Sequence, residues 1–221
     1  MSKLIIRVIP ILAVLLLLSV KGANAQGVSP YFGLGSAFDS SATQGGCPSG
    51  QIPDPIGFNQ AAGTCTPVNG IGGVFGVFGA DFMITPHIGV NGEYAFRFSQ
   101  SNYMPAEDLN VRPGFYDFNA VYQPSSGDKK IVPVLEAGFG GAKISYYETQ
   151  SAGSLFNQSE FFASTNHFQL HLAAGVKIYF KGDMFVKPQF DYHWVDNLTD
   201  QYGRSSVPEF TISIGYTFGR Q

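Results

Sequence analysis

Acidic, basic and histidine side chains recur at alternate positions along this chain, where they could exchange protons, bind a metal ion or pair with one another. Glu93 and Arg97 share one parity of a segment, and Lys187, Asp191 and His193 share one parity of another. Paired carboxylates and imidazoles are the side chains of general acid–base catalysis. The charged groups with this alternation are Glu93, Arg97, Asp117, Glu136, Lys177, Lys187, Asp191 and Glu209, with His171 and His193 alongside.

The spacing of these groups favours mutual pairing over a metal site or a cofactor site. His167 and His171 lie four residues apart, which on a strand separates them by about 13 Å, too far to share one ion. The glycines at 70, 72, 73, 76 and 79 do not form the G-x-G-x-x-G loop that holds a dinucleotide. The sequence therefore predicts no metal ligand, no cofactor and no catalytic residue.

The elements that must position the charged groups are segments that alternate between apolar and polar residues. In the last one, Phe210, Ile212, Ile214, Tyr216 and Phe218 share one parity, and polar or small residues occupy the other. Period two indicates a strand with two unlike faces. Eight segments behave in this way: 28–38, 73–83, 87–99, 115–122, 131–147, 168–180, 184–194 and 209–218. Most reach the length of about 9–11 residues with which a tilted strand crosses a bilayer.

The connections between these segments alternate between short and long. Short ones lie at 85–86, 124–129 and 181–183, and long ones at 39–69, 100–114, 148–166 and 196–207. Short turns on one side and long loops on the other are typical of transmembrane β-barrels. The sequence thus predicts an all-β fold, an eight-stranded antiparallel up-and-down barrel, with both chain ends on the short-turn side.

The two faces of the strands indicate which one contacts lipid. The apolar face carries aromatic residues at strand ends, namely Phe98, Tyr122, Trp194, Tyr216 and Phe218, as an interfacial girdle requires. A soluble barrel of lipocalin type would reverse the faces and is the alternative. In a membrane barrel the charged face lines a lumen just wide enough for side chains. Those charges must be paired, so we expect a structural polar network, with a narrow ion gate as the alternative.

The first residues have the features of a secretory signal peptide. Lys3 and Arg7 precede the apolar run 8–20, and Ala23-Asn24-Ala25 forms an A-x-A cleavage site. We therefore expect a signal peptide over 1–25 and one barrel domain over 26–221. Loss of the signal's three basic residues would leave 10 basic and 16 acidic residues, a formal charge of −6, which argues against a nucleic-acid partner.

Cys47 and Cys65 are the two cysteines, and both lie in the first long connection. Export permits a disulfide bond, and two cysteines allow one intramolecular pairing. A metal site is the weaker interpretation, because no further ligands stand at zinc-finger spacing. The sequence predicts a bridge over a loop of about 18 residues, worth roughly 3 kcal/mol in the chain-entropy model.

Three segments resemble the OmpA-like eight-stranded outer-membrane β-barrel proteins of Gram-negative bacteria. They are the opening 28–35, the stretch 185–192 and the closing 210–218. The resemblance implies residence in the outer membrane, in contact with its lipid and lipopolysaccharide. It also implies insertion by the barrel-assembly machinery, which would recognise the aromatic strand of Phe210, Ile212, Ile214, Tyr216 and Phe218.

The function expected from these features is non-enzymatic: a barrel that supports envelope integrity and displays surface loops. An adhesin or receptor that binds an unknown ligand through the Cys47–Cys65 loop is the alternative within the same fold. A lipid A-modifying barrel is less favoured, because a deacylase of that kind places Ser two residues after its His, whereas His193 is followed by Val195. A soluble lipid carrier is the remaining alternative, and it would not need detergent.

Overall fold

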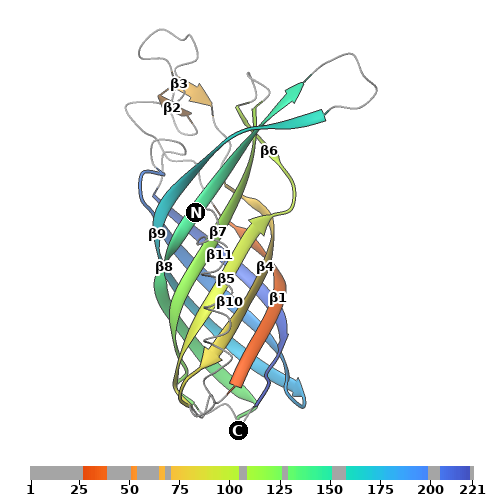
Figure 1. Ribbon diagram of the computed structural model, residues 1–221, viewed down its shortest axis with the longest axis vertical. Helices are drawn as coiled ribbons and strands as arrows, with labels where there is room; N and C mark the ends of the chain where they lie inside the picture. Colours follow the sequence, from red (N-terminus) through yellow and green to blue (C-terminus); the bar gives the residue numbers. More distant parts are fainter. Residues whose placement is uncertain are drawn as a thin grey trace, which may run out of the picture.

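The computed structural model describes residues 27–38, 51–53, 65–67, 71–104, 109–125, 129–150, 158–198 and 205–219. Among them, eight strands form a closed antiparallel barrel (Figure 1). The barrel strands are β1 (Gly27–Ala37), β4 (Gly73–Met83), β5 (Ile88–Arg97), β7 (Leu109–Tyr122), β8 (Ile131–Gln150), β9 (Gln158–Lys181), β10 (Met184–Val195) and β11 (Ser206–Tyr216). The predicted strand number and up-and-down order are confirmed.

Each barrel strand pairs with its neighbour in the sequence, and β1 pairs with β11 to close the ring. The β1–β11 pairing shows where the two ends of the barrel chain lie. Tyr31 lies opposite Gly215 on β11, and an additional bridge joins Val28 to Phe218, so both ends of the barrel chain meet at the short-turn end. This closure leaves no strand edge unpaired within the barrel.

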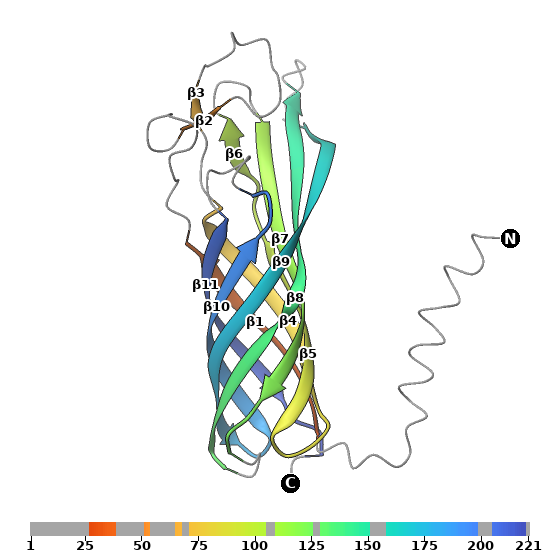
Figure 2. The same ribbon diagram turned by 90° about the vertical axis from the view of Figure 1, so that its left-hand side faces the viewer.

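Shorter strands lie at the opposite end of the barrel. β6 (Ser101–Met104) pairs with the start of β7, and β2 (Gln51–Pro53) pairs with β3 (Cys65–Pro67) as a separate two-stranded sheet. The paired strands β8 and β9 also continue past the other barrel strands at this end (Figure 2). None of the described residues forms a helix long and apolar enough to cross a membrane.

Two connections that the sequence predicts to be long loops are largely strand. Segment 148–166 is expected to be a loop, but β8 continues to Gln150 and β9 begins at Gln158. Segment 100–114 contains β6 and the start of β7, where Pro113 interrupts the sequence pattern. Beyond the membrane both faces of a strand can meet water, so the apolar–polar contrast fades although backbone pairing continues.

The apolar parity faces outward and the charged parity faces inward. Phe118 and Ile212 are 62% and 52% exposed, whereas Asp117 and Thr211 on the opposite parity are 2% and 1% exposed. Glycine permits close strand approach at the inner face: a Cβ at Gly140 would collide with the backbone of Tyr116 on β7. The sequence prediction of an apolar outside is confirmed, as a membrane barrel requires.

Candidate functional site: the polar interior of the barrel

The lower part of the interior is held by an ion pair that links β4 to β9. The Lys177 ammonium lies 2.8 Å from a carboxylate oxygen of Asp81. The Asn91 side-chain amide donates to the other oxygen of Asp81 at 2.6 Å and to the Tyr31 hydroxyl at 2.8 Å. Tyr31 in turn donates to Glu93 at 2.5 Å. These groups connect four strands and leave both carboxylates with donors, as burial demands.

Lys187 on β10 lies in the middle of the lumen and interacts with two acids. Its ammonium nitrogen lies 3.4 Å from Glu136 on β8 and 4.0 Å from Glu93 on β5. The same nitrogen lies 3.7 Å from the centre of the Tyr31 ring, a distance at which a cation is attracted by the ring face. Lys187 is fully buried, so its charge is balanced by protein groups alone.

Two histidines lie side by side in the upper part of the network. His171 on β9 has one ring nitrogen 2.9 Å from the Asn119 side-chain oxygen and the other 3.2 Å from Asp191. His193 on β10 is its register partner across the β9–β10 pair. The Nδ1 and Nε2 atoms of His193 lie 3.8 Å from Asp117 and 3.7 Å from Glu209. Both acids therefore face an imidazole without a close hydrogen bond to it.

The two imidazoles belong to a stack of rings, which bears on metal binding. The rings follow the order Phe75, Phe115, His193 and His171, and neighbouring centroids are 5.9, 4.6 and 4.7 Å apart. Asp117, His171 and His193 hold ligand atoms within 4.8 Å of one another. An imidazole binds a metal ion through a lone pair in its ring plane. Because the two imidazole planes differ by only 21°, their lone pairs cannot converge on one ion unless a ring turns.

Apolar side chains cover the polar network at both ends of the lumen. Towards the long-loop end, Phe75 and Phe115 are fully buried and pack in the main apolar cluster with Val195 and Val207. Towards the short-turn end, Met83, Val121 and Val134 form a second buried cluster. Buried apolar side chains therefore lie towards both ends of the polar section, which makes the interior a poor path for water or hydrated ions.

Seven of the eight predicted network residues lie in this buried interior. The exception is Arg97, which is half-buried at the top of β5 and donates to the Ser101 hydroxyl. The spacing of four predicts Glu93 as its partner, but Glu93 instead bonds Tyr31 and faces Lys187. The buried members of the set are Glu93, Asp117, Glu136, Lys177, Lys187, Asp191 and Glu209.

Sequence reasoning missed Asp81 and Tyr31, both of which lie on glycine-rich strands with weak alternation. It also missed the pairing of His171 with His193, although a usable signal was present. A hairpin turn at 181–183 places these two residues opposite each other if the strands pair evenly, as they do from Ala173 upward.

The remaining predicted features lie on the outer wall, at the ends of the chain or outside the described residues. The closing-strand residues Phe210, Ile212, Ile214 and Tyr216 lie on the outward parity of β11, and Phe218 follows in the bridge to β1. Their role in insertion stays a prediction. Cys47 and the leader 1–25 lie outside the described residues, so the disulfide and the signal peptide stay predictions as well.

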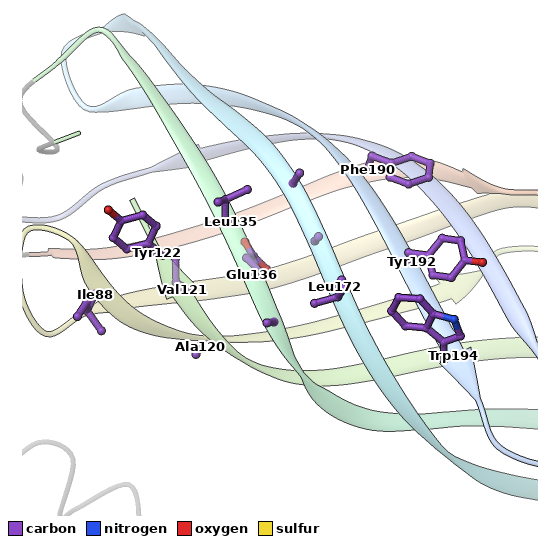
Figure 3. A pocket seen from close by; sticks show the side chains of 13 residues that line it. Ile88, Ala120, Val121, Tyr122, Leu135, Glu136, Leu172, Phe190, Tyr192 and Trp194 are labelled. Atoms are coloured by element: carbon purple, nitrogen blue, oxygen red, sulfur yellow. The ribbon is translucent and has the colours of Figure 1, made fainter. Parts of the chain in front are cut away.

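The outer wall also carries an apolar hollow of about 790 Å³ (Figure 3). Small side chains at Ala120, Ala137 and Ala174 form part of its lining. Ile88, Tyr122 and Leu135 lie towards one side, and Phe190, Tyr192 and Trp194 lie towards the other. Because the surrounding wall is apolar and exposed, this hollow belongs to the lipid-facing surface and not to the polar interior.

Solved structures that are similar to this chain include several outer-membrane proteins. Neisserial surface protein A shares 12% identity over 87% of this chain and 96% of its own, with a TM-score of 0.51. The N-terminal β-barrel domain of Pseudomonas aeruginosa OprF shares 12% over 88% and 99%, with a TM-score of 0.49. Ail, the attachment invasion locus protein of Yersinia pestis, shares 15% over 87% and 99%, with a TM-score of 0.48.

The protease OmpT of Escherichia coli is also similar, at 8% identity and a TM-score of 0.41. At identities this low, no activity of these proteins carries over to this chain. A comparison with curated protein sequences found no match. Residues 11–218 match the family described as outer membrane protein beta-barrel domain. Together with the closed barrel and its apolar outer wall, this match shows that the chain belongs to that family and resides in the outer membrane.

Proposed function

We propose that this chain is a non-enzymatic outer-membrane barrel that supports envelope integrity and displays surface structure. The observation that carries the proposal is the filled interior, in which buried ion pairs lie among buried apolar side chains. Lys187 and Lys177 are bound by acids of other strands, so these charges tie the wall together. A wall cross-linked in this way is suited to a mechanical role.

The same contacts argue against catalysis by the interior groups. Asp191 accepts from Gln189 at 2.6 Å and contacts His171, and Asp117 accepts from Gln169 at 2.7 Å. These acids therefore bind neighbouring side chains instead of facing a space that a substrate could enter. A general base needs the substrate within hydrogen-bond reach, and Asp117 and Asp191 are only 2% and 1% exposed.

The test is a deletion strain complemented with the wild-type gene. We expect deletion to increase uptake of a large hydrophobic dye through the outer membrane, with unchanged lipid A mass spectra and with restoration by the wild type. The purified barrel should show no steady conductance in planar bilayers. Altered lipid A that the wild type restores would instead support a lipid-modifying enzyme, and a stable conductance would support a pore.

A receptor or adhesin of the same fold is the second candidate, and the long β8–β9 hairpin favours it. This hairpin continues past the other barrel strands at the end opposite the short turns. Phe161 and Phe162 on it are 55% and 61% exposed, and Phe161 packs edge-on against Tyr147 at 5.9 Å. Exposed aromatic side chains are typical anchors for a partner.

Two variants separate this candidate from the structural role. If the hairpin binds a partner, replacing Phe161 and Phe162 by Ser should abolish cell attachment while the barrel stays folded and the dye barrier stays intact. Replacing Cys47 and Cys65 by Ser tests the predicted first loop in the same assay. Thiol labelling of unreduced, denatured protein should leave both cysteines unlabelled, and labelling of both would exclude the bridge.

A further inference from the structure

On the outward parity of the part of the wall that spans the membrane, two described residues are charged, and both are basic. They are Arg112 on β7 and Lys143 on β8. This part of the wall consists of the outward parity of β1, β4, β5, β7, β10 and β11, together with 131–145 of β8 and 164–180 of β9. Outside it, the described parts of β8 and β9 also carry the exposed charged residues Glu148, Glu160 and Lys181. In a chain with more acids than bases, two neighbouring cations on this wall need an explanation.

Arg112 and Lys143 lie on adjacent strands and line one pocket. Arg112 lies opposite Ser145 and Lys143 lies opposite Gly114, so the two cations are diagonal neighbours across the β7–β8 pair. The pocket has a volume of about 440 Å³. Its lining combines the two cations with the aromatic rings of Phe78, Tyr94, Phe96 and Tyr147.

The Arg112 side chain is held in place by protein groups that leave its charge uncompensated. Its Nε donates to the backbone carbonyl of Arg97 at 2.8 Å, and its guanidinium carbon lies 5.9 Å from the centre of the Phe96 ring. Among the described residues no carboxylate pairs with Arg112 or with Lys143. The pocket thus presents fixed positive charge beside an aromatic surface.

The two cations lie where the wall changes from apolar to polar. On β9 the outward residues are apolar up to Phe168 and polar at Asn166 and Ser164, and Asn166 is the register partner of Lys143. On β7 the outward residues Phe118 and Tyr116 give way to Arg112. An Arg or Lys at the bilayer midplane would cost about 2–4 kcal/mol, but near the interface the cost falls to about 0–1 kcal/mol. This height corresponds to the lipid headgroups.

We propose that the Arg112–Lys143 pocket binds the phosphate of a membrane lipid headgroup in the leaflet on the long-loop side. The guanidinium would bind phosphate oxygens in bidentate fashion and the ammonium would add a second charge. Basic pockets at the membrane boundary are established sites for anionic headgroups. The rings of Phe78 and Phe96, deeper in the pocket, would contact the first part of an acyl chain.

The experiment measures lipid binding to the refolded barrel in zwitterionic detergent by native mass spectrometry. The probes are lipid A with both phosphates, the same lipid after enzymatic removal of its phosphates, and inorganic phosphate alone. Arg112→Gln and Lys143→Gln should each weaken binding of the phosphorylated lipid about fivefold, and the double variant about 25-fold. Lys143→Arg should retain wild-type binding, and Lys130→Gln at the short-turn end is the matched control.

Each variant must first be shown to be folded, by migrating differently on a gel before and after boiling. Only then is its lipid binding compared. Weaker binding by the double variant, together with a preference for the phosphorylated lipid, would support the proposal. It is overturned if the double variant binds as the wild type does, if Lys130→Gln weakens binding equally, or if the phosphate-free lipid binds as well. Retention of inorganic phosphate with equal affinity would overturn the lipid as ligand and leave a simple anion site.

Discussion

Replacing Lys187 by Met tests whether the interior charges hold the barrel together. Met keeps much of the length of the side chain and removes its charge, so Glu136 and Glu93 lose the ammonium that lies 3.4 and 4.0 Å away. Six buried acids, namely Asp81, Glu93, Asp117, Glu136, Asp191 and Glu209, share two buried lysines in the described interior. The loss of one lysine therefore has no obvious compensation.

The expected loss of stability follows from these distances. At an effective dielectric constant of about 20, the two attractions amount to about 5 and about 4 kcal/mol. Desolvation of the lysine offsets much of this gain, because taking an ion out of water costs several kcal/mol. Breaking a buried pair by removing one partner typically costs about 3–5 kcal/mol, since it leaves an uncompensated charge. We expect Lys187→Met to lower the free energy of unfolding by that amount.

The assay is urea unfolding of the barrel from lipid vesicles. Trp194 is the single tryptophan and faces outward, so its fluorescence reports the loss of lipid contact. The double variant Lys187→Met with Glu136→Gln removes one of the uncompensated carboxylates and should be more stable than Lys187→Met. The coupling energy of the double-mutant cycle should be about 0.5–3 kcal/mol. An unchanged unfolding midpoint for Lys187→Met, or strictly additive effects, would refute the network as a source of stability.

Three further outcomes are expected. Phe118→Arg places a charge on the lipid-facing wall and should cost about 2–4 kcal/mol, whereas Phe161→Arg on the extended hairpin should be tolerated in the same urea titration; tolerance of Phe118→Arg would contradict its contact with lipid. Gly140→Ala should destabilise the barrel by about 1–3 kcal/mol because its Cβ meets the β7 backbone, while Gly92→Ala, whose Cβ has open space, serves as the control that should unfold at the wild-type midpoint. The folded protein should migrate differently on a gel before and after boiling, and recovery in the soluble fraction without such a shift would contradict residence in the outer membrane.

The fold was predictable from the sequence because the same constraint acts on every residue of a membrane-spanning strand. Each residue faces either lipid or lumen, so apolar and polar residues alternate in every strand that crosses the bilayer, as in 210–218. The prediction was wrong where strands extend beyond the membrane and this constraint no longer applies. In 148–166 both faces of the strands lie beyond the membrane. Apolar and polar residues therefore do not alternate there, although the backbone pairing of β8 with β9 persists.

On the strands with clear alternation, the sequence by itself determined which residues face inward and that their charges must be paired. Parity is a property of a single strand, and the cost of a buried charge is a property of a single side chain. Tertiary structure alone decided the partners, because these depend on strand register and on the stagger of a closed barrel. Lys177 therefore meets Asp81 from β4, Lys187 meets Glu136 and Glu93, and Arg97 lies at the rim. The same holds for the outer wall. The alternation of the sequence places Arg112 and Lys143 on the outward face, but only the β7–β8 register makes them neighbours in one pocket.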